Sequence, residues 1–337
     1  MATIKDVAKL AGVSTSTVSH VLNKTRFVSD DAQGRVDKAV RQLNYRPSSI
    51  ARSLKVKNTR TIGMLVTAST NPFYAEVVQA VERRCYESGY TLFLCNTEGD
   101  VERMKANLDA LEEKRVDGLL LMCSETNEDF FKLFESHQSV PVVVTDWGPA
   151  SDRLDRIYDH SEKGGYIATR HLIDMGHTRI GCITGPMNKR SASERMEGFL
   201  RAMNEARLDV RKEWIIEGDY DCAGGVKALS GLDGLPERPE ALFVCNDMMA
   251  LGVISEAARI GIRVPEDLSI VGYDDIYIAR YLTPPLTTIH QSTSKLAAMA
   301  VDTLLDRLDS KRTKGKVIRI ESNLVERKSV RKVDSSD

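Results

Sequence analysis

The sequence predicts an N-terminal all-α head followed by an α/β core of two parallel-sheet subdomains. Three observations predict this fold. The first sixty of the 337 residues contain amphipathic helical segments and almost no strand signal. From Thr61 onward, short apolar runs alternate with amphipathic stretches, as in parallel sheets covered by helices on both faces. Residues 1–60 also carry twelve Lys and Arg against four Asp and Glu, although the whole chain has a net charge of −1. A polyanion is therefore the expected partner of the head.

The head begins with two short helical segments joined by a glycine. "TIKDVAKLAG" offers Thr3 and Asp6 as a capping box and Gly12 as a helix stop. Ser14 then caps a second segment with an apolar stripe on one side. Two helices joined by such a tight turn predict a helix-turn-helix, and a third amphipathic segment over 30–45 can close a small core around it.

The second segment is a candidate for reading DNA bases. Its outward side chains are short and polar, and the surrounding region is basic. The major groove displays a distinct pattern of donors and acceptors for each base pair, which such side chains can read. We expect Thr15, Ser16 and His20 to lie there; an ordinary solvated helix face is the alternative.

The stretch "PSSIARSLKV", residues 47–56, follows the head. It is about two turns long, and isolated helices under about 12–15 residues are marginal in water. It should therefore fold only when something holds it. If two copies meet on DNA, Ala51 allows close packing, Leu54 can wedge between base pairs from the minor groove, and Lys55 lies near phosphates. A flexible linker is the alternative.

The core contains two series of strand signals, and the second series begins after "HSEKGG". The predicted strands are the runs "TIGMLVT", "YTLFLC", "DGLLLMC", "VPVVVT", "RIGCIT", "EALFVCN" and "LSIVGY". Two such halves enclose a cleft, and ligands of parallel sheets bind outside the carboxyl ends of the strands.

Polar and aromatic side chains gather at those strand ends. Phe73 and Tyr74 open a helix after the first strand, where aromatic platforms could flank a ring, and Asn71 beside them supplies an amide. Asp146, Asn246 and Asp274 each follow a strand. A strand-end Asp or Asn can equally cap the next helix, so the cleft role and the cap role both remain open for these residues.

Long motifs identify a family. "ATIKDVAKLAGVSTSTVSHVLNKTRFVS", "NYRPSSIARSLK", "TIGMLV" and "VPEDLSIVGYDD" with "TPPLTTIHQ" resemble the lactose-repressor/galactose-repressor family of bacterial regulators, from residue 2 to about 327. The resemblance implies a DNA-binding head, a hinge helix that inserts a leucine into the minor groove of a palindromic operator, and a periplasmic-binding-protein-like core that forms a homodimer. By position it adds Arg26 to the head contacts and matches Leu54 and Lys55 to the hinge wedge and its neighbour.

The resemblance also implies domain boundaries. We expect a head over 1–46, a hinge helix and linker over 47–59, an effector-binding and dimerisation core over 60–327, and a polar tail over 328–337. Within the core, the first subdomain should comprise about 60–160 plus 292–320, and the second about 161–291 plus 321–327.

The cleft residues resemble the sugar pocket of periplasmic ribose-binding proteins, in which aromatic rings sandwich the sugar and polar groups take its hydroxyls. The matching positions are Asn71, Phe73, Tyr74, Asp146, Arg195, Tyr220, Asn246, Tyr273, Asp274 and Gln291. We therefore expect D-ribose as the effector, releasing a repressor of ribose catabolism and transport genes from its operator. The alternative is a purine-responsive member of the family, which binds DNA with hypoxanthine or guanine as co-repressor.

Other classes of protein find no support in the sequence. We find no hydrolase, metalloprotease, P-loop or dinucleotide-binding motif, and the six cysteines and six histidines show no metal-ligand spacing. No apolar run approaches the ~20 residues that a membrane span needs, and the N-terminus lacks a secretion signal. We expect a cytoplasmic protein that is neither an enzyme nor a transport protein and that uses no metal or cofactor.

Overall fold

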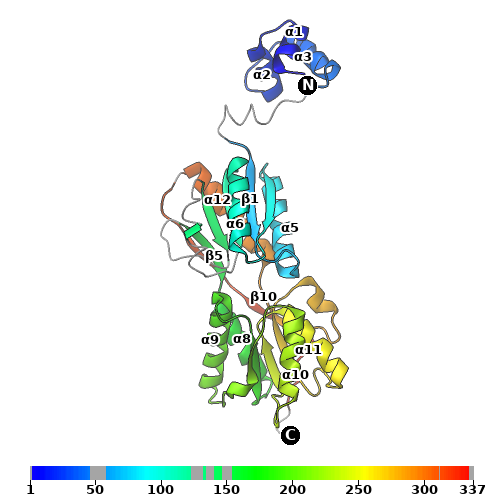
Figure 1. Ribbon diagram of the computed structural model, residues 1–337, viewed down its shortest axis with the longest axis vertical. Coiled ribbons are helices and arrows are strands. Elements are labelled where there is room, and N and C mark those ends of the chain that lie inside the picture. Colours follow the sequence, from blue (N-terminus) through cyan, green and yellow to red (C-terminus); the bar gives the residue numbers. More distant parts are fainter. Residues whose placement is uncertain are drawn as a thin grey trace. The chain divides into compact units, whose positions relative to one another are not determined.

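The structure, a computed structural model, describes residues 2–45, 58–122, 132–133, 140–145, 154–310 and 312–333. The chain divides into two compact units, the head up to Thr59 and the core from Arg60 onward (Figure 1). Each unit has its own hydrophobic core. No helix among the described residues is long and apolar enough to cross a membrane.

The head is a three-helix unit of α1 (Ile4–Ala11), α2 (Thr15–Asn23) and α3 (Asp30–Gln42). The expected capping box is confirmed, since the Asp6 carboxylate accepts from the Thr3 backbone N–H at 2.8 Å and the Thr3 hydroxyl accepts from the Asp6 N–H. Gly12 ends α1 in the left-handed region at φ 62°. One valine from each helix is fully buried, and these three side chains form the centre of the head core: Val7, Val18 and Val36.

The first subdomain of the core is built on a six-stranded parallel sheet in the order β11-β5-β4-β3-β1-β2. Its strands are β1 (Thr61–Val66), β2 (Thr91–Asn96), β3 (Gly118–Met122), β4 (Val142–Thr145), β5 (Asp155–Asp159) and β11 (Val317–Ile320). Its helices are α5 (Pro72–Glu87), α6 (Val101–Glu113) and α12 (Thr293–Ser310). Because side chains alternate along a strand, Met64 of β1 packs in the core cluster that includes α5 and α12, whereas Leu65 packs in the cluster that includes α6.

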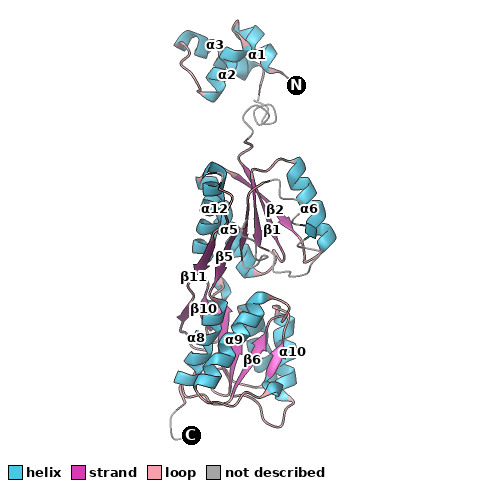
Figure 2. Cartoon of the chain, turned by 90° about the vertical axis from the view of Figure 1, so that its left-hand side faces the viewer, coloured by secondary structure: helices cyan, strands magenta, loops and turns pink. Residues whose placement is uncertain are grey.

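The second subdomain repeats this plan in a six-stranded sheet of order β12-β10-β9-β8-β6-β7, in which β12 alone is antiparallel to its neighbour. Figure 2 shows strands of both sheets between their helices. Its strands are β6 (Ile180–Thr184), β7 (Ile215–Glu217), β8 (Ala241–Val244), β9 (Ser269–Asp274), β10 (Thr287–His290) and β12 (Asn323–Val325). Its helices are α8 (Ser161–Asp174), α9 (Arg190–Glu205), α10 (Cys222–Asp233) and α11 (Asp247–Ile260), with short 3-10 turns η1 (Lys212–Trp214) and η2 (Tyr277–Tyr281). The fold class expected from the sequence is confirmed.

The chain passes between the two sheets three times within its described part: from β5 into α8, from β10 into α12 and from β11 into β12. The sequence patterns did not reveal the strands next to these crossings. In β5 only every second residue is buried, with Asp155 and Asp159 on the buried side, so the strand lacks a continuous apolar run. The crossings bring side chains of both subdomains together.

The segment that follows β12 packs on the second subdomain, although we expected a polar tail from residue 328. Ser329 is fully buried, and its carbonyl accepts from the Ile270 N–H at 2.7 Å. The Val333 N–H donates to the Met175 carbonyl at 2.8 Å. These backbone hydrogen bonds hold residues 328–333 in place despite their polar composition, and residues 334–337 lie outside the described part.

Close packing of α8 against α9 depends on Gly165. A Cβ at this position would overlap the backbone carbonyl oxygen of Arg195 in α9. We predict that Gly165→Ala lowers the free energy of unfolding by roughly 1–3 kcal/mol, because the two helices must separate. The matched control is Gly231→Ala in α10, where no atom lies within 4 Å of the added Cβ. That change should raise stability by about 0.5–1 kcal/mol. Urea denaturation measures the free energy of unfolding of both variants. Equal changes in Gly165→Ala and Gly231→Ala would contradict the packing argument.

Candidate effector pocket and DNA-binding surface

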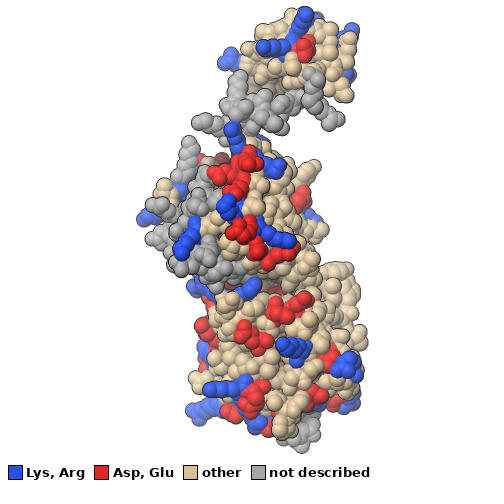
Figure 3. Space-filling view, in the orientation of Figure 1, with Lys and Arg blue, Asp and Glu red and all other residues tan. Residues whose placement is uncertain are grey.

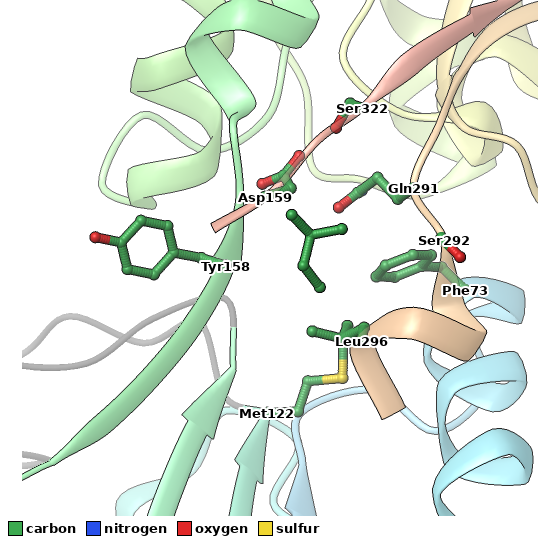
Figure 4. A pocket seen from close by; sticks show the side chains of 9 residues that line it. Phe73, Met122, Tyr158, Asp159, Gln291, Ser292, Leu296 and Ser322 are labelled. Atoms are coloured by element: carbon green, nitrogen blue, oxygen red, sulfur yellow. The ribbon is translucent and has the colours of Figure 1, made fainter. Parts of the chain in front are cut away.

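A pocket lies where the crossing segments meet the strand ends of the first subdomain (Figure 4). The space between its lining side chains is open to solvent and amounts to about 360 Å³ with that solvent included. The lining residues come from α5, α12, the ends of β3, β5 and β11, and the crossings themselves: Phe73, Met122, Tyr158, Asp159, Gln291, Ser292, Leu296, Ile320 and Ser322. The pocket is therefore assembled from segments that are far apart in the sequence.

Most of the lining is apolar. Figure 4 shows Phe73 at one side of the cavity, with Leu296 and Met122 below it. Asp159 and Gln291 supply polar groups in the upper part of the cavity in this view, across from Leu296 and Met122. A slot with an aromatic wall, apolar sides and a few polar groups suits a flat ring whose polar atoms lie on its edge.

Asp159, at the end of β5 in the first subdomain, is held by two side chains of the second subdomain. Its carboxylate accepts from the Tyr273 hydroxyl at 2.5 Å and from the Ser161 hydroxyl at 2.7 Å. Burial and the charge of Asp159 raise the pKa of the Tyr273 phenol well above its ordinary value, so the hydroxyl remains a donor. A Cβ at Gly164 would overlap that hydroxyl, so glycine is needed where α8 approaches Tyr273. Tyr273 was expected to contact the effector; it is fully buried and positions Asp159.

A second buried cluster contains Arg195, Asp274 and Gln291. The Gln291 amide donates to Asp274 Oδ1 at 2.8 Å, and the Arg195 guanidinium lies 3.8 Å from the same carboxylate. Arg195 also donates to the Cys245 carbonyl at 2.5 Å and lies over the Tyr273 ring, 3.6 Å from its centroid. Burial alone would lower the pKa of Arg195, but the neighbouring tyrosines and carboxylates raise it well above its ordinary value. The cluster thus keeps a positive charge beside Asp274.

The backbone at Asp274 is strained. Asp274 and the next residue, Asp275, both have positive φ, at 113° and 60°. The Asp275 carboxylate pairs with His290 Nδ1 at 2.9 Å and with the Arg327 guanidinium at 2.6 Å. Burial would raise the pKa of Asp275, but these two hydrogen bonds lower it below its ordinary value. These contacts stabilise the turn that carries Asp274.

Asn246 and Asn71 serve as helix caps. Asn246, which is buried, accepts from the Met249 N–H at 2.9 Å at the start of α11 and donates to the Tyr220 carbonyl at 2.9 Å. Asn71 accepts from the Phe73 N–H at 2.9 Å at the start of α5. For Asn246 the sequence left cap and cleft roles open, and the structure displays the cap. Asn71, expected to supply an amide to the cleft, also caps a helix.

The aromatic residues occupy different places. Phe73 lines the pocket and meets Tyr74 edge to face at a centroid distance of 6.0 Å. Tyr74 packs against the large core cluster. Tyr220, at φ 68°, directs its hydroxyl to the Ser191 hydroxyl at 3.2 Å. The structure therefore brings one of these three rings into the pocket lining.

The expected head contacts lie at the surface of α2 and the following loop. Thr15 and Ser16 are exposed in the first turn of α2, and Arg26 is exposed beyond its end. His20 is half-buried, with Nδ1 at 2.8 Å from the Thr25 hydroxyl. Lys and Arg side chains project from the face of the head seen in Figure 3. The expected positions Ala51, Leu54, Lys55 and Asp146 lie outside the described residues.

Sequence reasoning missed several pocket residues: Met122, Tyr158, Asp159, Ser292, Leu296, Ile320 and Ser322. Asp159 carried a usable signal, since it ends a strand as Asp274 does. The strand that it ends lacks a continuous apolar run, so the sequence pattern does not reveal the strand. Met122, Leu296 and Ile320 carried no signal, because apolar residues at these positions look like ordinary core.

Comparisons with known proteins were decisive for the family. A model described as "Bacterial regulatory proteins, lacI family" matches residues 3–48, and one described as "Periplasmic binding protein-like domain" matches residues 169–330. The HTH-type transcriptional repressor PurR of Aliivibrio salmonicida is 53% identical over 99% of this chain and 100% of that protein. PurR of Vibrio vulnificus is 50% identical over the same shares. The chain belongs to the LacI family. As a member, it is a transcriptional repressor and not an enzyme.

Solved structures of LacI family members share the architecture. The lac repressor dimer bound to operator and an anti-inducer matches with a TM-score of 0.89 and 29% identity, covering 98% of this chain and 99% of that one. A LacI family regulator from Enterococcus faecium with bound ribose matches with a TM-score of 0.73 and 28% identity, covering 81% of this chain and all of that one.

The cap role of Asn246 is testable by substitution. We predict that Asn246→Ala lowers the free energy of unfolding by about 1–2 kcal/mol, because α11 loses its cap and the Tyr220 carbonyl loses its donor. Asn246→Ser keeps a capping oxygen and should recover roughly half of the loss. Thermal unfolding monitored by circular dichroism measures both. Equal stability of the alanine and wild-type proteins would contradict the cap.

Proposed function

We propose that this LacI family member is a repressor that uses a purine base, hypoxanthine or guanine, as co-repressor. The observation that carries the proposal is an identity of 50–55% to relatives named PurR, the purine repressor, over nearly the full length of both proteins. The ribose-bound family member is 28% identical. Our expectation of D-ribose as effector, and of ribose catabolism and transport genes as targets, is therefore not supported, and the purine alternative replaces it.

The chemistry of the pocket supports a base over a sugar. A pentose presents hydroxyl groups around its ring, and each needs a partner when it is buried. Asn71 and Asn246, two of the amides expected to bind those hydroxyls, cap helices instead. A purine has apolar faces and polar atoms on its edge, which suits a cavity lined by Phe73, Met122 and Leu296.

We propose the following roles in the pocket. The Phe73 ring stacks on the base, and the Asp274–Gln291 pair meets polar atoms on its edge. Arg195, 3.8 Å from the Asp274 carboxylate, places a positive charge beside that group. Asp159 and Tyr273 fix the end of the cavity. Tyr74, Tyr220, Asn71 and Asn246 act through the helices and turns that they stabilise.

DNA binding is assigned to the head and to the segment after it. Thr15, Ser16, His20 and Arg26 contact base edges and phosphates, as their exposure on a basic three-helix unit suggests. Residues 47–56 form a hinge in the complex, with Leu54 as the minor-groove wedge, Ala51 at the contact between the two hinges, and Lys55 near the backbone. The protein acts in the cytoplasm on a palindromic operator.

We propose that the protein is a homodimer, in which each subunit binds one half-site of the palindromic operator. The similar lac repressor structure is a dimer on its operator. In this chain, η2 exposes three large side chains side by side, Tyr277, Ile278 and Tyr281, which are 57%, 43% and 64% exposed. A second copy covers this apolar patch in our proposal, since monomers rarely leave contiguous patches of this kind in water.

The sign of regulation follows from the co-repressor role. The base binds between the subdomains and favours the arrangement in which the two hinges fold on DNA, so operator affinity rises. Linkage requires that operator raises the affinity for the base by the same factor, typically about 5–150-fold for a coupling of 1–3 kcal/mol.

Binding measurements test the effector. We predict that hypoxanthine and guanine bind the purified protein in calorimetry and that D-ribose does not. Asp274→Asn should weaken hypoxanthine binding by about 10–100-fold, because a hydrogen bond to a charged group contributes about 1.5–3 kcal/mol. The matched control, Asp309→Asn at the exposed end of α12, should bind normally. Binding of ribose without binding of either base would overturn the proposal.

The hinge role of Leu54 is testable separately. We predict that Leu54→Ala weakens binding to a palindromic operator by roughly tenfold or more, because the wedge loses most of its buried apolar surface. Fluorescence anisotropy with labelled duplex measures operator affinity, and calorimetry should show unchanged hypoxanthine affinity without DNA. Leu200→Ala, at an exposed leucine of α9, serves as the control. If Leu54→Ala binds operator as tightly as this control, the wedge is refuted.

A further inference from the structure

A cation–π contact joins the two subdomains at the rim of the pocket. Arg190 is the first residue of α9 in the second subdomain, and Tyr158 belongs to β5 in the first. The Arg190 guanidinium carbon lies 4.7 Å from the centroid of the Tyr158 ring. Contacts of this kind are effective within about 6 Å of the ring centroid. The contact exists only while the two subdomains are as close as they are here.

Both partners are held in place. Arg190 Nε donates to Glu194 Oε1 at 2.6 Å, one turn further along α9, which fixes the direction of the guanidinium. On the Tyr158 side, Arg319 of β11 lies 5.5 Å from the ring centroid. Partial burial would raise the pKa of the Tyr158 phenol, but hydrogen bonds and charges from Arg319 and Arg190 lower it. The ring therefore lies among cationic groups from both subdomains.

The contact is adjacent to the effector pocket. Tyr158 is one of the lining residues, and Figure 4 shows its hydroxyl directed away from the cavity. Next to Arg190 on α9, Ser191 is hydrogen-bonded to the Tyr220 hydroxyl. The start of α9 thus contacts the second subdomain through Ser191 and the first subdomain through Arg190.

We propose that the Arg190–Tyr158 contact is the positioning contact that couples effector binding to the arrangement of the two subdomains. This inference rests on the proposed purine-responsive function. An effector that occupies the pocket holds the subdomains together, and the Arg190–Tyr158 contact adds to the stability of that arrangement. Arg190 and Tyr158 thereby raise the affinity for the effector, and Arg190 does so without touching it.

A double-mutant cycle tests the coupling. The variants are Arg190→Met, Tyr158→Leu and the double variant, and calorimetry gives the affinity of each for hypoxanthine. Each single variant should bind about two- to tenfold more weakly, which is the range expected for a cation–π contact. The double variant should bind no more weakly than the weaker single variant, because both changes remove the same contact. If the double variant loses hypoxanthine affinity by the product of the two single losses, the two side chains act independently and the proposal is overturned.

A second pair of the same chemistry provides the control. Arg201 lies 4.2 Å from the centroid of the Tyr166 ring, but α9 and α8 carry this pair within one subdomain. Arg201→Met, Tyr166→Leu and their double variant should therefore retain wild-type hypoxanthine affinity. If these changes weaken binding as much as those at Arg190 and Tyr158, the effect is a general consequence of losing surface contacts and the proposal fails.

Operator binding supplies a readout that a purely structural role would not change. Operator affinity without hypoxanthine should fall in Arg190→Met by the same factor as hypoxanthine affinity, because the contact stabilises the arrangement that binds both, and saturating hypoxanthine should restore operator affinity toward the wild-type level. A wild-type protein that does not bind hypoxanthine would remove both this inference and the proposed function. A wild-type protein that binds, with a cycle that shows no coupling, would remove the inference alone.

Discussion

The hydrogen bond from Tyr273 to Asp159 is the interaction on which the core depends. Tyr273 belongs to β9 of the second sheet, and Asp159 ends β5 of the first sheet, where the chain crosses to α8. Both side chains are buried, and a hydrogen bond is stronger in a surrounding of low dielectric constant. Arg195 lies under the same ring and beside Asp274. The crossing, the pocket end and the strained turn at Asp274 are therefore one connected network.

This network explains why few polar groups line the pocket. A buried polar group is costly unless it is hydrogen-bonded, and the residues at the strand ends satisfy one another first. Asn246 and Asn71 are used by helix starts, and Asp274 is held by Gln291. The remaining surface is mostly apolar with a small polar edge. Such a surface distinguishes a flat base from a polyhydroxylated sugar more by shape than by the number of its hydrogen bonds.

The head and the core of the chain carry net charges of opposite sign. The head is basic and small, with a core of a few valines and alanines, whereas the core is acidic and large. A basic unit gains affinity for DNA from phosphate contacts, and an acidic core is repelled by the same phosphates.

The sequence by itself determined the fold class, the helix-turn-helix with its capping box, and the family, because periodicity, caps and long motifs are local features. It also identified Phe73, Arg195, Asp274 and Gln291, which the structure places in the pocket lining or in the buried cluster connected to it. The tertiary structure decided the rest. The pocket is formed where three crossings bring distant segments together, so Leu296 and Ile320 became lining residues without any local signal. It also determined the helix-cap hydrogen bonds of Asn71 and Asn246, since a side chain forms its hydrogen bonds with the partners that the fold places beside it, and residue type alone does not specify them.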